Sequence, residues 1–292
     1  MKFLVTGASG LIGKKVVEDL IKQNHEVHSI YHDDKPTGGI PVRLDLADLE
    51  KINQTINQIN PDIIIHLAAM TNVDLCETEK ELAHTINAKA TEALARSAAK
   101  IKAFFVYVST DYVFDGINGM KKEDDITNPL GYYGKTKLEG EISLDNLASN
   151  WAIVRTSTPF GLHQKKKSFP LWVKENLEKN IEIKVLIDQF TSPTYVPNLS
   201  KMIIEVATKQ INGKIHLAGA TRISRYSLAL MIADKLGLDK KLLLEAKIED
   251  MDWKSKRPKD SSLDVTKATE TLTEKPQPIE QSLSLFLDEI WK

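Results

Sequence analysis

Short apolar runs alternate with longer amphipathic stretches through the first 155 residues. The short runs predict buried strands, and stretches with apolar residues every three or four positions predict helices. Strands and helices that alternate in this way form a parallel, doubly wound sheet with right-handed crossovers. The expected strands span residues 3–6, 27–31, 63–67, 104–109 and 151–155, and the expected helices span 11–23, 49–59, 80–99 and 133–148.

The pattern becomes less regular after residue 155. We expect an α/β fold in which a Rossmann-like, doubly wound parallel sheet forms a dinucleotide-binding domain (1–155) and a smaller C-terminal α/β lobe (156–292) holds the substrate. No clean linker separates them, so the boundary is soft and some later segments can return to the first domain. The later helices are expected at 169–178, 198–208 and 227–236, with loop-rich segments at 156–168 and 188–197.

The composition is that of an ordinary globular enzyme, with 292 residues of which 42% are hydrophobic. The chain has 39 basic and 40 acidic residues, so no overall field attracts nucleic acid or an anionic membrane. Cys76 is the only cysteine, which excludes an intramolecular disulfide and favours a reducing compartment. No apolar run is long enough to span a bilayer, and no signal-peptide pattern is present. We expect a cytoplasmic protein that binds neither membrane nor nucleic acid.

A glycine-rich segment, GASGLIG, follows the first predicted strand and places glycines at positions 7, 10 and 13. This spacing differs from the G-x-G-x-x-G of ordinary dehydrogenases. Gly7 would make the turn, Gly10 would admit phosphates to the first N–H groups of the helix, and Gly13 would allow close helix packing. The segment predicts a pyrophosphate-binding turn, with an ordinary tight turn as the alternative.

A tyrosine and a lysine four residues apart, Tyr133 and Lys137, share one face of a predicted helix. A nearby ammonium group stabilises phenolate, so we expect a lowered pKa for Tyr133 and proton exchange with a carbonyl or an alcohol. Tyr132 and Lys135 form a competing pair with a shorter spacing that points elsewhere around the helix. Many helices contain tyrosine and lysine at this interval. The added evidence is a strand that ends in two hydroxyls, Ser109 and Thr110, one of which can face the reacting oxygen at the carboxyl edge of the sheet.

Three segments together resemble the extended short-chain dehydrogenases/reductases: the glycine-rich turn, STDYVFDG from residue 109 and YGKTKLEGE from residue 133. Within that family the sequence is most similar to the dTDP-4-dehydrorhamnose reductases. The resemblance implies an NAD(P)H-dependent oxidoreductase that reduces the 4-keto group of dTDP-4-dehydro-L-rhamnose, giving dTDP-L-rhamnose. Further matching segments are HLAAMTNVDLCE (66–77), INA (86–88), RTS (155–157), DQFTSPT (188–194) and KRPKDSSLD (256–264).

The resemblance also implies residue roles. Thr110 matches the hydroxyl that bonds the substrate carbonyl, Tyr133 the proton donor, and Lys137 the lysine that holds the nicotinamide ribose. Asp45 matches a contact beside the adenine, although it could instead cap the following helix. The implied cofactor-binding residues are Gly7, Gly10, Leu11, Ile12, Gly13, Asp45, Leu46, Ala68, Ala69, Met70, Tyr133 and Lys137.

In the resembling family a nucleotide sugar lies across the cleft between the two parts of the chain. Arginine suits its diphosphate, because the guanidinium fork pairs with phosphate oxygens. We interpret the lysines at 165–167 as surface residues, with attraction of the diphosphate as the alternative. Trp172 and Trp253 are interpreted as packing residues that could also stack on a base or hexose. The nominated substrate-binding residues are Asn72, Val73, Thr110, Gln189 and Arg257.

Coenzyme choice depends on the end of the second predicted strand, which lacks the acidic residue that usually holds the 2′-hydroxyl of NAD. Asp33 and Asp34 lie just beyond it, and no arginine stands there for a 2′-phosphate. We favour NADP(H), with NAD(H) as the alternative. His66 and His216 are interpreted as ordinary strand residues, and no metal site is assigned. A homodimer, and magnesium at its contact as in some relatives, are options that the sequence does not locate.

Two other functions share these motifs. An NAD-dependent nucleotide-sugar epimerase or dehydratase has the same turn and tyrosine–lysine pair, but it keeps NAD bound and returns the hydride to its substrate. The regulatory β subunit of methionine adenosyltransferase resembles the same reductases and acts as a non-catalytic partner. The presence of Thr110, Tyr133 and Lys137 favours an enzyme.

Overall fold

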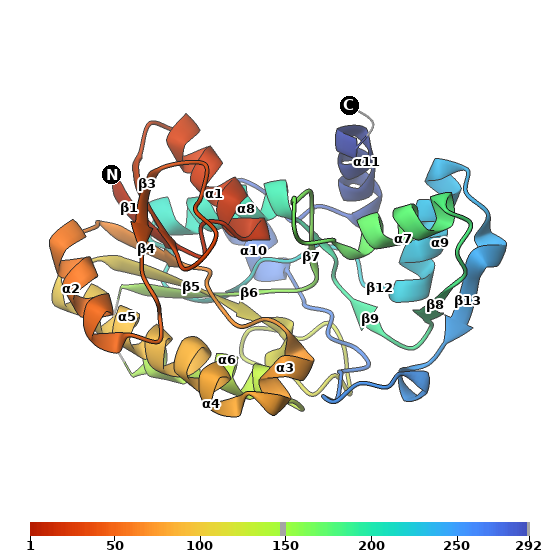
Figure 1. Cartoon of the computed structure of the whole chain (residues 1–292), viewed down its shortest axis with the longest axis horizontal. Helices are drawn as coiled ribbons and strands as arrows, with labels where there is room; N and C mark the ends of the chain where they lie inside the picture. Colours follow the sequence, from red (N-terminus) through yellow and green to blue (C-terminus); the bar gives the residue numbers. More distant parts are fainter. Residues whose placement is uncertain (147–149, 291–292) are drawn as a thin grey trace.

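The computed structural model describes residues 1–146 and 150–290. Its central sheet contains β1 (Lys2–Thr6), β2 (Glu26–Tyr31), β3 (Ile40–Arg43), β4 (Ile63–His66), β5 (Phe104–Thr110), β6 (Trp151–Thr156) and β11 (Gly213–His216). These seven strands are parallel, with the order β11-β6-β5-β4-β1-β2-β3. The chain winds outward from β1 in both directions, so the predicted Rossmann-like fold is confirmed (Figure 1).

The five predicted strands lie within one residue of the observed bounds because buried parallel strands are continuous apolar runs. Every residue of β5 is buried, and so is every residue of β4. The sequence analysis missed β3 and β11. β3 contains no fully buried residue, and β11 begins with Gly213 and Lys214, so neither presents an apolar run.

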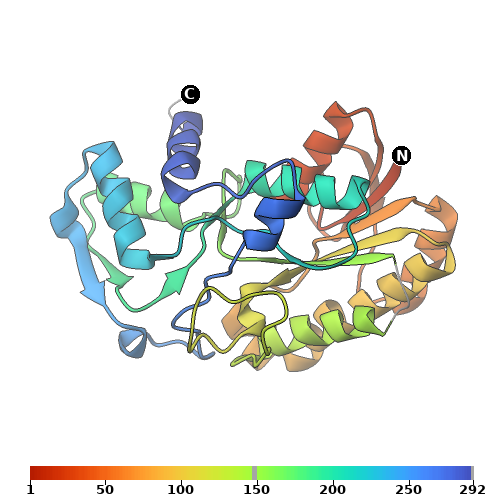
Figure 2. The same ribbon diagram turned by 180° about the vertical axis from the view of Figure 1, so that it is seen from behind.

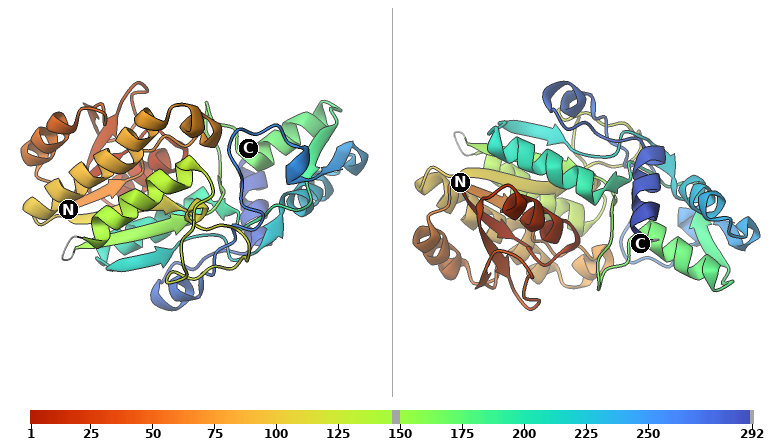
Figure 3. Two further views of the ribbon diagram at one scale, coloured as in Figure 1. Left: turned by 90° about the horizontal axis from the view of Figure 1, so that it is seen from below. Right: turned by 90° about the horizontal axis from the view of Figure 1, so that it is seen from above.

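Helices cover both faces of the sheet, and the two views of Figure 3 show one layer each. Phe3 and Val5 of β1 face the first layer, whereas Leu4 faces the second. Each face of the sheet therefore has its own hydrophobic core. The first layer contains α1 (Leu11–Lys22), α8 (Val196–Thr208) and α10 (Thr266–Thr271), and the second contains α2 (Leu49–Ile59), α5 (Ala90–Lys100) and α6 (Tyr132–Asp145).

The long helix predicted at 80–99 is not continuous. It consists of α4 (Lys80–His84), a π-helical turn (Thr85–Lys89) and α5, and a short helix that we did not predict, α3 (Val73–Thr78), precedes it. A π-helical turn adds one residue without changing the apolar pattern visibly, so the sequence gives no signal for it. The predicted end of α6 at residue 148 lies outside the described residues.

A second, smaller lobe lies beside the carboxyl ends of the sheet strands (Figure 2). Its core includes Val173, Ile232 and Phe286, which come from three different helices. Two short pairings, β7 with β10 and β9 with β12, link it to the sheet. The lobe contains α7 (Phe169–Glu178), α9 (Arg225–Leu236), α11 (Ile279–Ile290), β8 (Ile183–Leu186) and β13 (Leu243–Ala246), and the links are β7 (Pro159–Phe160), β9 (Phe190–Thr191), β10 (Thr194–Tyr195) and β12 (Ile223–Ser224).

The chain passes between the sheet and the lobe several times. After β6 it enters the lobe, returns for α8 and β11, leaves again for α9 and β13, and returns for α10 before it ends with α11. The expected division at residue 155 stays a prediction, and any division has to accommodate these returning segments.

Candidate active site

The glycine-rich turn connects β1 to α1. Gly7 has a φ of +67°, and a Cβ on Gly13 would lie 2.0 Å from the Gly7 carbonyl oxygen. Both positions therefore require glycine. Gly10 is the N-cap of α1 and has no side chain to cap it, so Leu11 and Ile12 begin a helix whose first N–H groups are open to an anion. The turn fits the pyrophosphate of a dinucleotide.

A buried cluster joins the ends of β1 and β4 below this turn. The Thr6 hydroxyl accepts hydrogen bonds from the N–H groups of Leu67 and Ala68, each at 3.1 Å, and lies 2.7 Å from Nδ1 of His66. The other ring nitrogen of His66 lies 3.0 Å from the Thr91 hydroxyl. Burial lowers the pKa of His66 well below its usual value. The cluster places Ala68 against the turn, where a Cβ on Gly7 would approach its nitrogen to 2.9 Å.

Asn87, which the sequence analysis did not nominate, holds the segment after β4. Its side-chain oxygen Oδ1 accepts from the Met70 N–H at 2.8 Å, and its side-chain Nδ2 donates to the Met70 carbonyl and the Thr136 hydroxyl at 3.1 Å each. Ala69 lies in the same segment. Asn87 belongs to the π-helical turn and is fully buried. Its only sequence signal was the INA segment of the family resemblance.

Tyr133 is the second residue of α6 and lies beside Thr110 at the end of β5. A hydrogen bond with the Thr110 side chain favours the phenolate, but burial outweighs it and raises the pKa of Tyr133. The expected lowering by Lys137 is therefore wrong for this arrangement. The competing Tyr132 lies on another side of the helix, where the Lys80 ammonium sits 5.5 Å from its ring centre.

Lys137 is buried one helical turn after Tyr133. Its ammonium donates to the Val108 carbonyl at 2.9 Å and lies 4.1 Å from the ring centre of Tyr107. Burial lowers the pKa of Lys137 to about 7, against an opposing effect of Glu141. The amine can therefore be charged or neutral near neutral pH.

The buried lysine predicts a pH-dependent stability. Because the pKa of Lys137 falls from 10.5 to about 7 on folding, the unfolded chain binds more protons between these values, so this group makes the unfolding free energy rise with pH. Urea denaturation across that pH range should therefore show wild type gaining stability relative to Lys137→Met as pH rises. Lys135→Met, on the exposed side of the helix, should follow wild type. A pH-independent difference between wild type and Lys137→Met would contradict this assignment.

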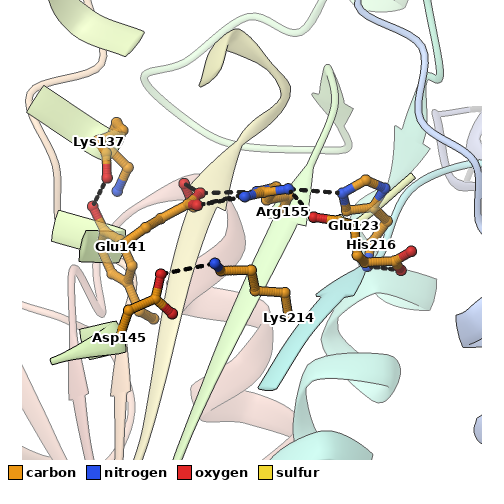
Figure 4. Close-up of polar contacts among 9 residues, drawn as sticks. Glu123, Lys137, Glu141, Asp145, Arg155, Lys214 and His216 are labelled. Atoms are coloured by element: carbon orange, nitrogen blue, oxygen red, sulfur yellow. Dashed lines mark hydrogen bonds and ion pairs between the residues drawn. The ribbon is translucent and has the colours of Figure 1, made fainter. Parts of the chain in front are cut away.

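Arg155 on β6 and Glu141 on α6 form a buried ion pair (Figure 4). Nε and Nη2 of Arg155 donate to the two carboxylate oxygens of Glu141 at 2.6–3.2 Å, and Ser109 donates to the same carboxylate at 2.5 Å. Nη1 of Arg155 donates to the Glu123 carbonyl at 2.9 Å and approaches Nε2 of His216 at 3.4 Å. Burial and the arginine charge lower the pKa of His216 to about 3, so this histidine is neutral. The network fixes α6 to the sheet.

A cavity of about 380 Å³ opens in the lobe. Phe169, Trp172, Gln189, Arg225 and Trp253 contribute to its wall. Nε of Arg225 donates to the Gln189 side chain at 3.3 Å, and its guanidinium lies 4.9 Å from the Phe169 ring centre. Gln189 was predicted to bind substrate, whereas Arg225 was not, because none of the segments that match the family contains it.

Arg257 lies next to this cavity, 5.0 Å from the ring centre of Trp253. Its Nη2 donates to Asp74 at 2.8 Å, while its Nη1 is buried and has no partner among the described residues. The guanidinium therefore keeps a hydrogen-bond donor that no described residue uses.

The other nominated residues have local structural roles. Asn72 caps α3 by accepting from the Leu75 N–H at 3.0 Å, and Val73 is the first residue of that helix. Leu46 is 8% exposed and belongs to the hydrophobic core. Asp45 accepts from the Ala47 N–H, but Asp48 is the residue that caps α2, so the capping alternative for Asp45 is wrong.

Among the described residues, no group of three or more histidine, cysteine or acidic side chains could hold a metal ion. Nor does that part of the chain contain a helix both long enough and apolar enough to cross a membrane.

The sequence is similar to known proteins along nearly its whole length. A family model described as RmlD substrate binding domain matches residues 1–291. The dTDP-4-dehydrorhamnose reductase of Aggregatibacter actinomycetemcomitans is 33% identical, with 97% of each chain covered. Methionine adenosyltransferase 2 subunit beta of Mus musculus is 31% identical, and the match covers 100% of this chain and 90% of that protein.

Solved structures agree with these matches. A hypothetical dTDP-4-dehydrorhamnose reductase from Sulfolobus tokodaii is 38% identical, with a TM-score of 0.87. The match covers 95% of this chain and 97% of that chain. The dTDP-4-dehydrorhamnose reductase from Bacillus anthracis str. Ames, in complex with NADP, is 30% identical with a TM-score of 0.88, covering 99% of this chain and 100% of its own.

Proposed function

Since the chain belongs to the RmlD substrate binding domain family, we propose that it reduces the 4-keto group of dTDP-4-dehydro-L-rhamnose to the alcohol of dTDP-L-rhamnose with NAD(P)H. The observation that carries this proposal is the grouping of Thr110, Tyr133 and Lys137 at the sheet edge that also carries the glycine-rich turn. A carbonyl reductase needs a proton donor and a coenzyme site close together, and this edge provides both.

The bound reduced nicotinamide supplies the hydride, and the chain's own residues handle the proton. Because burial raises the pKa of Tyr133, its hydroxyl stays protonated at neutral pH and can donate to the carbonyl oxygen. Thr110 donates to Asp111 at 2.9 Å in this structure and can turn its hydroxyl toward that oxygen. Lys137 is held by the Val108 carbonyl, where it can contact the nicotinamide ribose.

The lobe cavity is the proposed site of the nucleotide. Its volume of about 380 Å³ lies within the range of ordinary ligand pockets. Trp172 and Trp253 offer flat surfaces for a base, Gln189 offers an amide, and Arg225 and Arg257 offer guanidinium groups for a diphosphate. We propose NADP(H) as the preferred coenzyme, a choice supported by the NADP complex of the Bacillus anthracis relative. A homodimer and a role for magnesium stay predictions.

The test is to supply the purified protein with dTDP-4-dehydro-L-rhamnose and either NADPH or NADH. We expect one coenzyme oxidised for each molecule of dTDP-L-rhamnose formed, with the product identified by NMR. Turnover with no net coenzyme consumption and stoichiometric bound NAD would instead favour an epimerase or dehydratase. No turnover on any nucleotide sugar, together with specific capture of a methionine adenosyltransferase, would favour the regulatory subunit.

A further inference from the structure

A second cavity, of about 150 Å³, adjoins the glycine-rich turn and is lined by neither Tyr133 nor Lys137. Ala8 and Ser9 of the turn, Lys14 of α1 and the segment 34–38 after β2 form most of its wall. In an open α/β sheet the adenosine half of a dinucleotide lies beyond the end of β2, next to the pyrophosphate turn. The cavity is in that place.

A distant segment closes the third side of this cavity. Residues 163–165 follow the first link to the lobe, yet they line the cavity together with the turn. His163 holds them there, because its Nε2 donates to the Ser9 carbonyl at 2.9 Å while its Nδ1 accepts from the N–H groups of Lys165 and Lys166. In these bonds Nε2 is the donor and Nδ1 the acceptor, and together they fix the orientation of the ring.

The held segment places the Lys165 ammonium at the mouth of the cavity, where it pairs with Asp34. The pair is exposed, with 67% of the lysine side chain and 54% of the aspartate accessible. Exposed pairs are screened by water and contribute little, so the lysine can exchange the carboxylate for another anion at small cost. Lys35 lines the same cavity and has no ion-pair partner among the residues the structure describes.

We propose that Lys165 recognises the 2′-phosphate of NADP(H) and that Asp34 acts against this phosphate, so that the two residues set the coenzyme preference. The proposal rests on the proposed function and deepens its coenzyme site. A monoester phosphate carries nearly two negative charges at neutral pH and suits an ammonium group, whereas the 2′-hydroxyl of NAD(H) needs only an acceptor, which the Asp34 carboxylate supplies. No arginine directly follows β2 in the sequence, and the structure instead brings a lysine there from more than a hundred residues away.

Adenosine fragments test this assignment without the reaction. Titration calorimetry with adenosine 2′,5′-bisphosphate and with 5′-AMP measures the 2′-phosphate separately. We expect wild type to bind the bisphosphate more tightly than 5′-AMP. Lys165→Gln should weaken binding of the bisphosphate about tenfold or more, as the loss of a charge-assisted contact does. It should change the affinity for 5′-AMP less than about twofold. Asp34→Asn should strengthen binding of the bisphosphate.

Lys166→Gln is the matched control, because it removes the same charge from the same segment without touching the cavity wall. It should change both affinities less than about threefold, by loss of long-range attraction only. The proposal would be overturned if Lys165→Gln lost equal affinity for both fragments, or if Lys165→Gln and Lys166→Gln had equal effects on binding. The proposal would also be overturned if wild type bound the bisphosphate no more tightly than 5′-AMP. In that case binding of 5′-AMP would still be consistent with the proposed reductase. Binding of neither fragment would overturn both.

Discussion

Tyr133→Phe is expected to lower kcat for reduction of the 4-keto sugar by about 10²–10⁴-fold, the usual contribution of a general acid. The substitution removes one hydroxyl and leaves the ring that packs at 6.0 Å, edge to face, against Tyr112. NADPH binding, followed by the fluorescence of the coenzyme, should change far less than turnover, because the glycine-rich turn is untouched. The loss would therefore appear in kcat rather than in coenzyme affinity.

Tyr132→Phe is the matched control for this prediction. It makes the same chemical change one residue earlier, at a ring that lies beside Lys80 and away from Thr110. Its turnover should stay close to that of wild type. Near-normal turnover of Tyr133→Phe, or equal losses in the two variants, would refute the assignment of the proton donor.

Glu141→Gln is expected to destabilise the fold by about 3–5 kcal/mol, the usual cost of leaving one partner of a buried ion pair uncompensated. Arg155 and Glu141 have side chains only 2% and 1% exposed, so water cannot replace the lost charge. Glutamine keeps the shape and still accepts from Ser109, which isolates the effect of charge. The free energy of unfolding, measured with urea, checks the prediction.

A double variant distinguishes the ion pair from a general disturbance of α6. Adding Arg155→Met to Glu141→Gln removes the unpaired charge, so the double variant should be more stable than Glu141→Gln alone. Glu139→Gln alters an exposed acid on the same helix, whose carboxylate contacts His84 at 2.9 Å, and should cost less than about 1 kcal/mol. If the double variant lost as much stability as the sum of the losses in Glu141→Gln and Arg155→Met, the two residues would not be coupled.

Five of the seven sheet strands could be predicted from the sequence because each is a short, mainly apolar run. The glycine spacing likewise located a turn whose geometry excludes a Cβ at Gly7 and Gly13. The family resemblance is confirmed by the match over residues 1–291. The nominated catalytic and cofactor residues stay predictions. The structure does place Thr110, Tyr133 and Lys137 at one sheet edge.

The missed features depend on contacts between residues far apart in the sequence. Arg225 reaches the lobe cavity through a bond to Gln189, and Asn87 reaches Met70 through a π-helical turn. The prediction of a lowered pKa for Tyr133 was wrong because the spacing shows which side chains share a helix face but not how deeply they are buried. Desolvation then reverses the direction of the shift.

The repeated passage of the chain between sheet and lobe limits how specificity can be re-engineered. The lobe core combines side chains from α7, α9 and α11, which are separated in sequence by α8, β11 and α10 of the sheet domain. A lobe from a relative with another sugar preference could not be transplanted as one continuous insert. Chimeras would need at least three exchanged segments, and point substitutions around the lobe cavity are the simpler route to new substrates.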